Sequence, residues 1–123
     1  MLLKDCYPGS SSGSPTHLVS FGNRFVFRAN HPSYGIELWI SDGTPAGTHV
    51  LSDIRGGPSS SYPSWLTRCG DKLFFKAYSN LDGYELWQSD LTTFGTSMVK
   101  DLYNGGGSSS PAYLVAVGDL VYF

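Results

Sequence analysis

Short segments of alternating hydrophobic and polar residues run through the chain, separated by Gly, Pro, Asn and Asp. In residues 24–30, Phe25, Phe27 and Ala29 recur with a period of two, which places them on one face of an extended strand. No segment shows the period of 3.6 that an amphipathic helix requires. With 15 Gly and 7 Pro in 123 residues, turn residues are also too densely spaced for a long helix. The pattern predicts an all-β protein.

The turn signals divide the chain into strand-length segments. Some of these strands carry apolar residues on both faces, as Phe25 and Val26 do. A sheet with one face in water would alternate apolar and polar residues, so we expect both faces to be covered. The expected strands are 17–21, 24–30, 36–41 and 48–54, followed by 65–69, 72–78, 84–89 and 96–102.

The chain repeats itself at a spacing of 48 positions, without insertion or deletion, so that Glu37 recurs as Glu85. This shift creates 75 residue pairs, of which 28 are identical. Several positions agree in all three copies, as in the series Asp5, Asp53 and Asp101. We therefore expect part of a longer array: the end of a preceding unit (1–15, a fourth strand and a Ser/Pro loop), complete units at 16–63 and 64–111, and the truncated start of a third unit at 112–123.

The second half of each unit carries the most specific motif. In the first copy it comprises Glu37, Leu38, Trp39, Ser41, Asp42, Gly43, Thr44, Gly47, Thr48 and Asp53. The second copy has Glu85, Leu86, Trp87, Ser89, Asp90, Thr92, Gly95, Thr96 and Asp101, with Leu91 in place of Gly43. This motif resembles the ELWxxDGT repeat family of large, mostly bacterial, exported proteins. The resemblance implies propeller-like arrays at the cell surface or outside the cell, and no catalytic residues.

Independently of the resemblance, four strands in a repeat of this length indicate a blade-like unit. The length lies between the roughly 40–45 residues of WD repeats and the roughly 50 of kelch repeats. The predicted fold is thus all-β, with four-stranded antiparallel, blade-like repeats in a β-propeller-like, incomplete array. A β-sandwich or an open β-solenoid built from the same meanders remains the alternative.

Charge and hydropathy exclude two classes of partner. The chain has 8 Lys and Arg against 10 Asp and Glu, a net charge of −2, and its basic residues are not clustered. Nucleic-acid affinity depends on clustered basic residues, so no nucleic-acid partner is expected. The longest apolar runs are far shorter than the roughly 20 residues of a membrane helix, so no membrane span is expected.

The repeated acidic residues fit structural roles. Asp42 and Asp90 each precede a turn, where an Asp carboxylate accepts a hydrogen bond from the amide two residues on. Calcium is the alternative, with Asp53 and Asp101 as further ligands. Because Ca²⁺ needs about six to eight oxygen ligands and each unit supplies few, no metal site is predicted.

Two further features suggest scaffold residues. Glu37 is expected to face Arg28 across a hairpin, and Glu85 to face Lys76, as cross-strand ion pairs. No second carboxylate or nucleophile accompanies these glutamates, so no catalytic site is predicted.

The aromatic residues divide into a recurrent and a variable set. Trp39 and Trp87 occupy equivalent positions and are expected to pack between units. The variable position His17, Trp65 and Tyr113 lies beside the Ser-rich loop and is the better candidate for facing a ligand such as a sugar.

No residue pattern indicates a cofactor. His17, His31 and His49 occupy non-equivalent positions, so they do not form a repeated metal site. Cys6 and Cys69 are also non-equivalent, and either a single disulfide or burial as small apolar side chains is compatible with them.

These observations favour a non-enzymatic extracellular or cell-surface repeat protein, used as a structural or adhesive scaffold or in a filament. Its partners would be other copies of itself or further repeats of the same chain. A carbohydrate- or protein-binding propeller, recognising glycans or surface proteins, is the first alternative. The second is a propeller domain of a larger exported enzyme.

Overall fold

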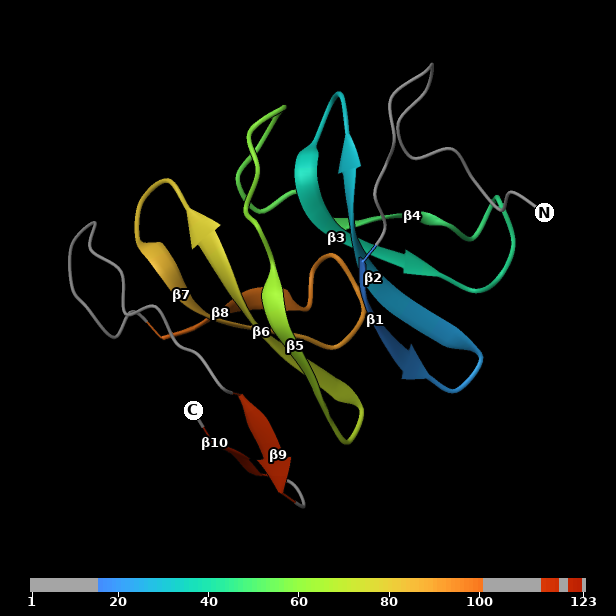
Figure 1. Cartoon of the computed structure of the whole chain (residues 1–123), viewed down its shortest axis with the longest axis vertical. Helices are drawn as coiled ribbons and strands as arrows, with labels where there is room; N and C mark the ends of the chain where they lie inside the picture. The colour runs from blue at the N-terminus through green and yellow to red at the C-terminus, as the bar shows by residue number, and fades with distance from the viewer. Residues whose placement is uncertain (1–15, 101–113, 118–119, 123) are drawn as a thin grey trace.

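The computed structural model describes residues 16–100, 114–117 and 120–122, and that part of the chain consists of strands and turns without a helix (Figure 1). The predicted all-β character is confirmed. None of these residues belongs to a helix that could cross a membrane. The strands are β1 (Thr16–Phe21), β2 (Arg24–His31), β3 (Gly35–Ser41), β4 (His49–Ser52), β5 (Ser64–Cys69), β6 (Lys72–Ser79), β7 (Gly83–Ser89), β8 (Thr96–Lys100), β9 (Val115–Val117) and β10 (Leu120–Tyr122).

The strands form two four-stranded antiparallel sheets and a two-stranded ladder. Sheet 1 has the order β1-β2-β3-β4, sheet 2 has the order β5-β6-β7-β8, and β9 pairs with β10. Strands that are consecutive in sequence are therefore neighbours in space, as in a meander. The first strands of the three groups are neighbours, because β5 contacts β1 on one side and β9 on the other (Figure 1).

The two sheets have the same internal register. Phe27 pairs with Trp39 in sheet 1, and the equivalent residues Phe75 and Trp87 pair in sheet 2. The first hairpin of each sheet closes with a two-residue turn, and its glycine has φ +68° at Gly22. Positive φ at the first turn position and not at the second, Asn23, is that of a type II′ turn, whose twist matches the adjoining strands.

One face of each sheet contributes to a shared core. Side chains alternate between faces along a strand, so Val26 and Leu38 of sheet 1 lie on the face opposite to Phe27. They pack in one buried cluster with Leu73 and Phe75 of sheet 2. The face of sheet 1 that carries Val26 is thus covered by the face of sheet 2 that carries Phe75. Because Phe75 is the equivalent of Phe27, the two sheets contact each other through non-equivalent faces.

The segment between the sheets is hydrogen-bonded to both of them. Ser61 donates its backbone N–H to the carbonyl of Ile36 in β3 and accepts a 2.8 Å hydrogen bond from the N–H of Tyr78 in β6. Gly35 lies directly under this segment, since a Cβ atom there would meet the backbone oxygens of Pro58 and Ser59 at 2.6 and 2.7 Å. The segment therefore fixes the spacing of the two sheets.

Candidate functional site

The turn after β3 is held by a network of side chains from the repeated motif. The backbone N–H of Thr44 donates to Asp42 Oδ1 at 2.9 Å, and the Thr44 hydroxyl donates to the same oxygen at 2.6 Å. Thr44 Oγ1 in turn accepts from the N–H of Gly47 at 3.0 Å. Ser41 and Thr48 close the turn, with their hydroxyl oxygens 2.7 Å apart.

The second turn, after β7, repeats this network. Asp90 accepts from the N–H and hydroxyl of Thr92 at 3.0 and 2.5 Å, and Thr92 Oγ1 accepts from the N–H of Gly95 at 3.0 Å. Ser89 and Thr96 form the closing pair, with hydroxyl oxygens 2.8 Å apart. In both turns these hydrogen bonds lower the pKa of the Asp below its usual 3.8.

Leu91 fits the second turn although Gly43 stands at this position in the first. Both residues have positive φ, +73° at Leu91 and +91° at Gly43. The leucine side chain is buried in the cluster between the two sheets. Its burial compensates for a backbone conformation that costs a non-glycine residue roughly 1–2 kcal/mol.

Glu37 is buried and does not pair with Arg28. In the observed register Arg28 lies opposite Leu38, and Glu37 lies opposite Ala29, so the expected cross-strand pair is wrong. The Glu37 carboxylate instead accepts a hydrogen bond from the Ser61 hydroxyl and one of 3.3 Å from the N–H of Arg55. Burial raises the pKa of Glu37 from 4.5 to about 7, although the hydrogen bond from Ser61 acts in the opposite direction.

The second expected ion pair is wrong for the same reason. Lys76 lies opposite Leu86, and Glu85 lies opposite Ala77. Glu85 is completely buried, as Glu37 is. The ammonium group of Lys76 instead lies 4.6 Å from the ring centre of Tyr84.

The two tryptophans of the motif lie in different clusters. Trp87 packs against the core between the sheets. Trp39 is buried on the outward face of sheet 1, between the rings of Phe27, His31 and Tyr34. Neither indole Nε1 has a hydrogen-bond partner within the described part of the chain.

The acidic residues do not converge on a common point. The carboxylates of Asp42 and Asp90 bind their own turns, and Asp53 Oδ2 accepts a 3.0 Å hydrogen bond from the N–H of Gly57, just after β4 ends at Ser52. Within residues 16–100, 114–117 and 120–122, no three His, Cys, Asp or Glu side chains are placed to hold a metal ion. Asp101 lies outside the described residues.

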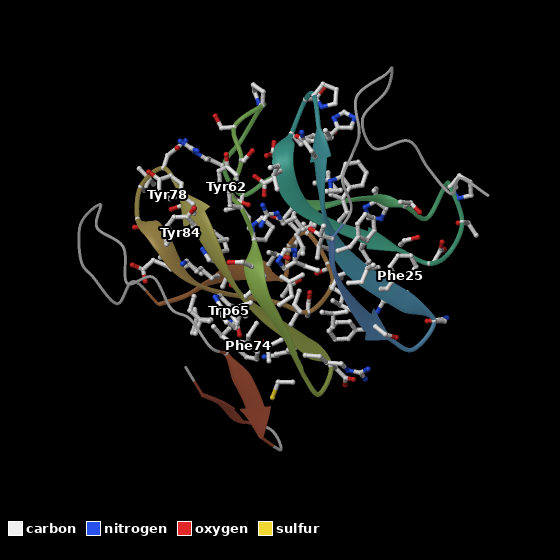
Figure 2. The ribbon with its side chains drawn as sticks, in the orientation of Figure 1. Phe25, Tyr62, Trp65, Phe74, Tyr78 and Tyr84 are labelled. Atoms are coloured by element: carbon white, nitrogen blue, oxygen red, sulfur yellow. The ribbon has the colours of Figure 1, made fainter. Side chains whose placement is uncertain are left out.

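The variable aromatic position opens into a hollow, which we call the β1–β5 hollow. It has a volume of about 390 Å³ and lies between the first strands of the two sheets, lined by His17, Leu18, Val19, Ser64, Trp65 and Leu66. Trp65 is 41% exposed, and Figure 2 shows it on β5, below Tyr62. Tyr113 lies outside the described residues, so His17 and Trp65 are the two members of the variable position that the structure brings together.

A β-bulge in each first strand aims these two side chains. The register shifts between Thr16 and Val19 in β1, and at the equivalent point in β5. His17 and Trp65 occupy the bulges with φ of +58° and +54°. Strained non-glycine residues of this kind cluster at binding sites, and bulges re-aim side chains there.

The structure also shows residues whose roles the sequence does not reveal. Arg55 stacks on Tyr78 with its guanidinium carbon 4.6 Å from the ring centre, and its Nε donates to Asn80 Oδ1 at 2.8 Å. Arg28 donates to the carbonyl of Pro63 at 3.5 Å. The recurring serines of the segment before Pro63 are the only sequence signal for this joint between the sheets.

Of the two cysteines, only Cys69 lies in the part of the chain that the structure describes. Cys69 is buried at the end of β5. Cys6 lies outside the described residues.

Comparison of the chain with known protein families, with curated proteins and with solved structures finds no similar protein.

Proposed function

We propose that this chain is a non-enzymatic repeat protein of the cell surface or extracellular space, in which blade-like sheets stack in a propeller-like array to form a structural or adhesive scaffold. The assignment to the ELWxxDGT repeat family, and with it the location, rests on the motif in residues 37–54. The stacking rests on the equivalence of the two sheets in register, bulge and turn network.

One observation carries the stacking proposal. Val99 in β8 is 41% exposed, whereas its equivalent in β4, Leu51, is 1% exposed. Leu51 is covered because sheet 2 packs on sheet 1. Val99 occupies the equivalent place in sheet 2, at the same register shift in the pairing of the last two strands. Sheet 1 has an uncovered residue of the same kind on its other side. Leu18 in β1 is 64% exposed, whereas its equivalent in β5, Leu66, packs against the shared core.

The two exposed faces, at Val99 and at Leu18, are equivalent to the two faces that already pack on each other between sheets 1 and 2. The face of sheet 1 that carries Leu51 already binds the face of sheet 2 that carries Phe75. A further sheet of the same kind would cover Val99 in the same way. Such head-to-tail contacts produce rings or filaments, because the two contacting surfaces differ.

Sedimentation velocity over a range of concentrations tests the proposal. The chain is expected to form larger species as its concentration rises, and Val99→Lys is expected to abolish them by placing a charge in the contact. Leu81→Lys, at a loop residue that is 80% exposed, should leave assembly unchanged. A chain that stays monomeric throughout, or that assembles equally well with Val99→Lys, would contradict the stacking.

A carbohydrate- or protein-binding array is the second candidate function. The β1–β5 hollow favours it, because a scaffold alone does not require exposed aromatic side chains at strained backbone positions. A glycan array separates the two functions, since a lectin binds saturably.

A further inference from the structure

We propose that the β1–β5 hollow binds one neutral pyranose ring of a glycan, with Trp65 as the stacking platform and His17 and Ser64 as its polar contacts. This inference rests on the second candidate function and assigns its site and ligand class.

The side chains around the hollow have the chemistry of a sugar site. Trp65, a residue of β5 that is 41% exposed, can offer an aromatic face to the C–H groups of a pyranose. The imidazole of His17 and the hydroxyl of Ser64 can bond sugar hydroxyl groups. None of the six described residues that line the hollow is Asp, Glu, Lys or Arg, which favours a neutral sugar over an acidic one.

The size of the hollow selects a small ligand. Its volume of about 390 Å³ lies at the lower end of the roughly 300–1,000 Å³ typical of small-molecule sites. A stable protein partner would need roughly 800 Å² on each side, far more than six residues provide. A single ring, at the end or in the middle of a glycan, matches this size.

The backbone conformation at His17 and Trp65 suggests that their side chains are needed for binding. Glycine would adopt the φ values of the two bulges without strain, yet one sheet has His17 and the other has Trp65. The ring of His17 is further oriented by Thr16, whose Oγ1 lies 2.8 Å from His17 Nδ1. The strain and the orientation are those of a site prepared before its ligand binds.

The test is an array of neutral glycans terminating in galactose, glucose, mannose, fucose or N-acetylglucosamine, with sialylated and sulfated glycans beside them. The strongest neutral glycan is then titrated against variants. Trp65→Gly removes the platform, and glycine accepts φ +54°, so the fold is expected to persist, which a cooperative thermal unfolding transition checks. Affinity should fall roughly tenfold or more with Trp65→Gly and less with Trp65→Phe.

Phe94→Ala is the matched control, because Phe94 is fully exposed in the second turn and does not line the hollow. It should bind as the unchanged chain does. Sedimentation of Trp65→Gly separates this inference from the scaffold proposal, since assembly should be retained when sugar binding is lost. Absence of saturable binding to neutral glycans, binding to acidic glycans alone, or full affinity in Trp65→Gly would overturn the proposal.

Discussion

At the scale of single residues, the buried glutamate is the feature that most constrains the joint between the sheets. Glu37 has no exposed surface, and its oxygens bind the Ser61 hydroxyl and the N–H of Arg55. Removing the Ser61 hydroxyl would leave a buried acceptor without its donor. Such a loss costs about 1–3 kcal/mol, so Ser61→Ala is expected to lower the free energy of unfolding by that amount in urea denaturation. A change below a few tenths of a kcal/mol would contradict the role assigned to this hydroxyl.

The raised pKa of Glu37 predicts a pH dependence of stability. The folded protein holds the Glu37 proton up to about pH 7, whereas the unfolded chain releases it near pH 4.5. Folding therefore binds a proton in this window, and the free energy of unfolding falls as pH rises from about 4.5 to about 7, by roughly 3 kcal/mol from this group alone.

Glu37→Gln supplies the control for that dependence. The amide cannot ionise, so the decline between pH 4.5 and pH 7 should be absent from the variant when both proteins are unfolded in urea at matched pH values. A parallel decline in both proteins would show that other groups cause it.

At the scale of elements, the turns after β3 and β7 depend on a glycine that makes room for an aspartate. A Cβ atom on Gly95 would collide with the Asp90 carboxylate, which Thr92 holds in place. Gly95→Ala must therefore break hydrogen bonds of the turn, and we expect it to lower the free energy of unfolding by about 1–3 kcal/mol. Phe94→Ala, at the exposed neighbour, should change it by less than about 0.5 kcal/mol in the same urea titration.

Much of the strand and turn structure could be predicted from the sequence. The hairpins, the strand bounds within two residues where the structure describes them, and the hydrogen bonds of Asp42 and Asp90 follow from period-two patterns and turn residues. The partner of Glu37 could not be predicted, because a hairpin register depends on loop geometry. The loop places His31 opposite Gly35, where the expected register would place Tyr34 opposite His31. A slip of one residue in register changes every cross-strand pair.

The candidate site was predictable only in part. Variation at an otherwise regular spacing marked His17 and Trp65, but the sequence does not show that they share a hollow. That follows from the bulges in β1 and β5 and from the packing of the sheets side by side. Bulges carry no clear sequence signal here, because residues other than glycine occupy them.

At the scale of the whole molecule, Leu91 links the second turn to the core between the sheets. Leu91→Ala keeps the unfavourable φ and loses the buried contacts, so it should cost about 2–5 kcal/mol. Leu91→Gly loses the same contacts but relieves the strain, so it should cost less than Leu91→Ala. Thermal and urea unfolding of both variants check this order, and the reverse order would contradict the strain assigned to Leu91.

Stacked units that stabilise one another should behave as a one-dimensional array, in which each added unit contributes its own stability and one more interface. The most direct test is to duplicate residues 64–111 in frame, which adds one unit of 48 residues. Urea unfolding of this chain is compared with that of the original chain. A chain in which the added 48 residues have a shuffled sequence is the control. The account predicts a single cooperative transition with a higher midpoint and a larger m-value for the duplicated chain alone. An unchanged midpoint, or a separate transition for the added residues, would contradict it.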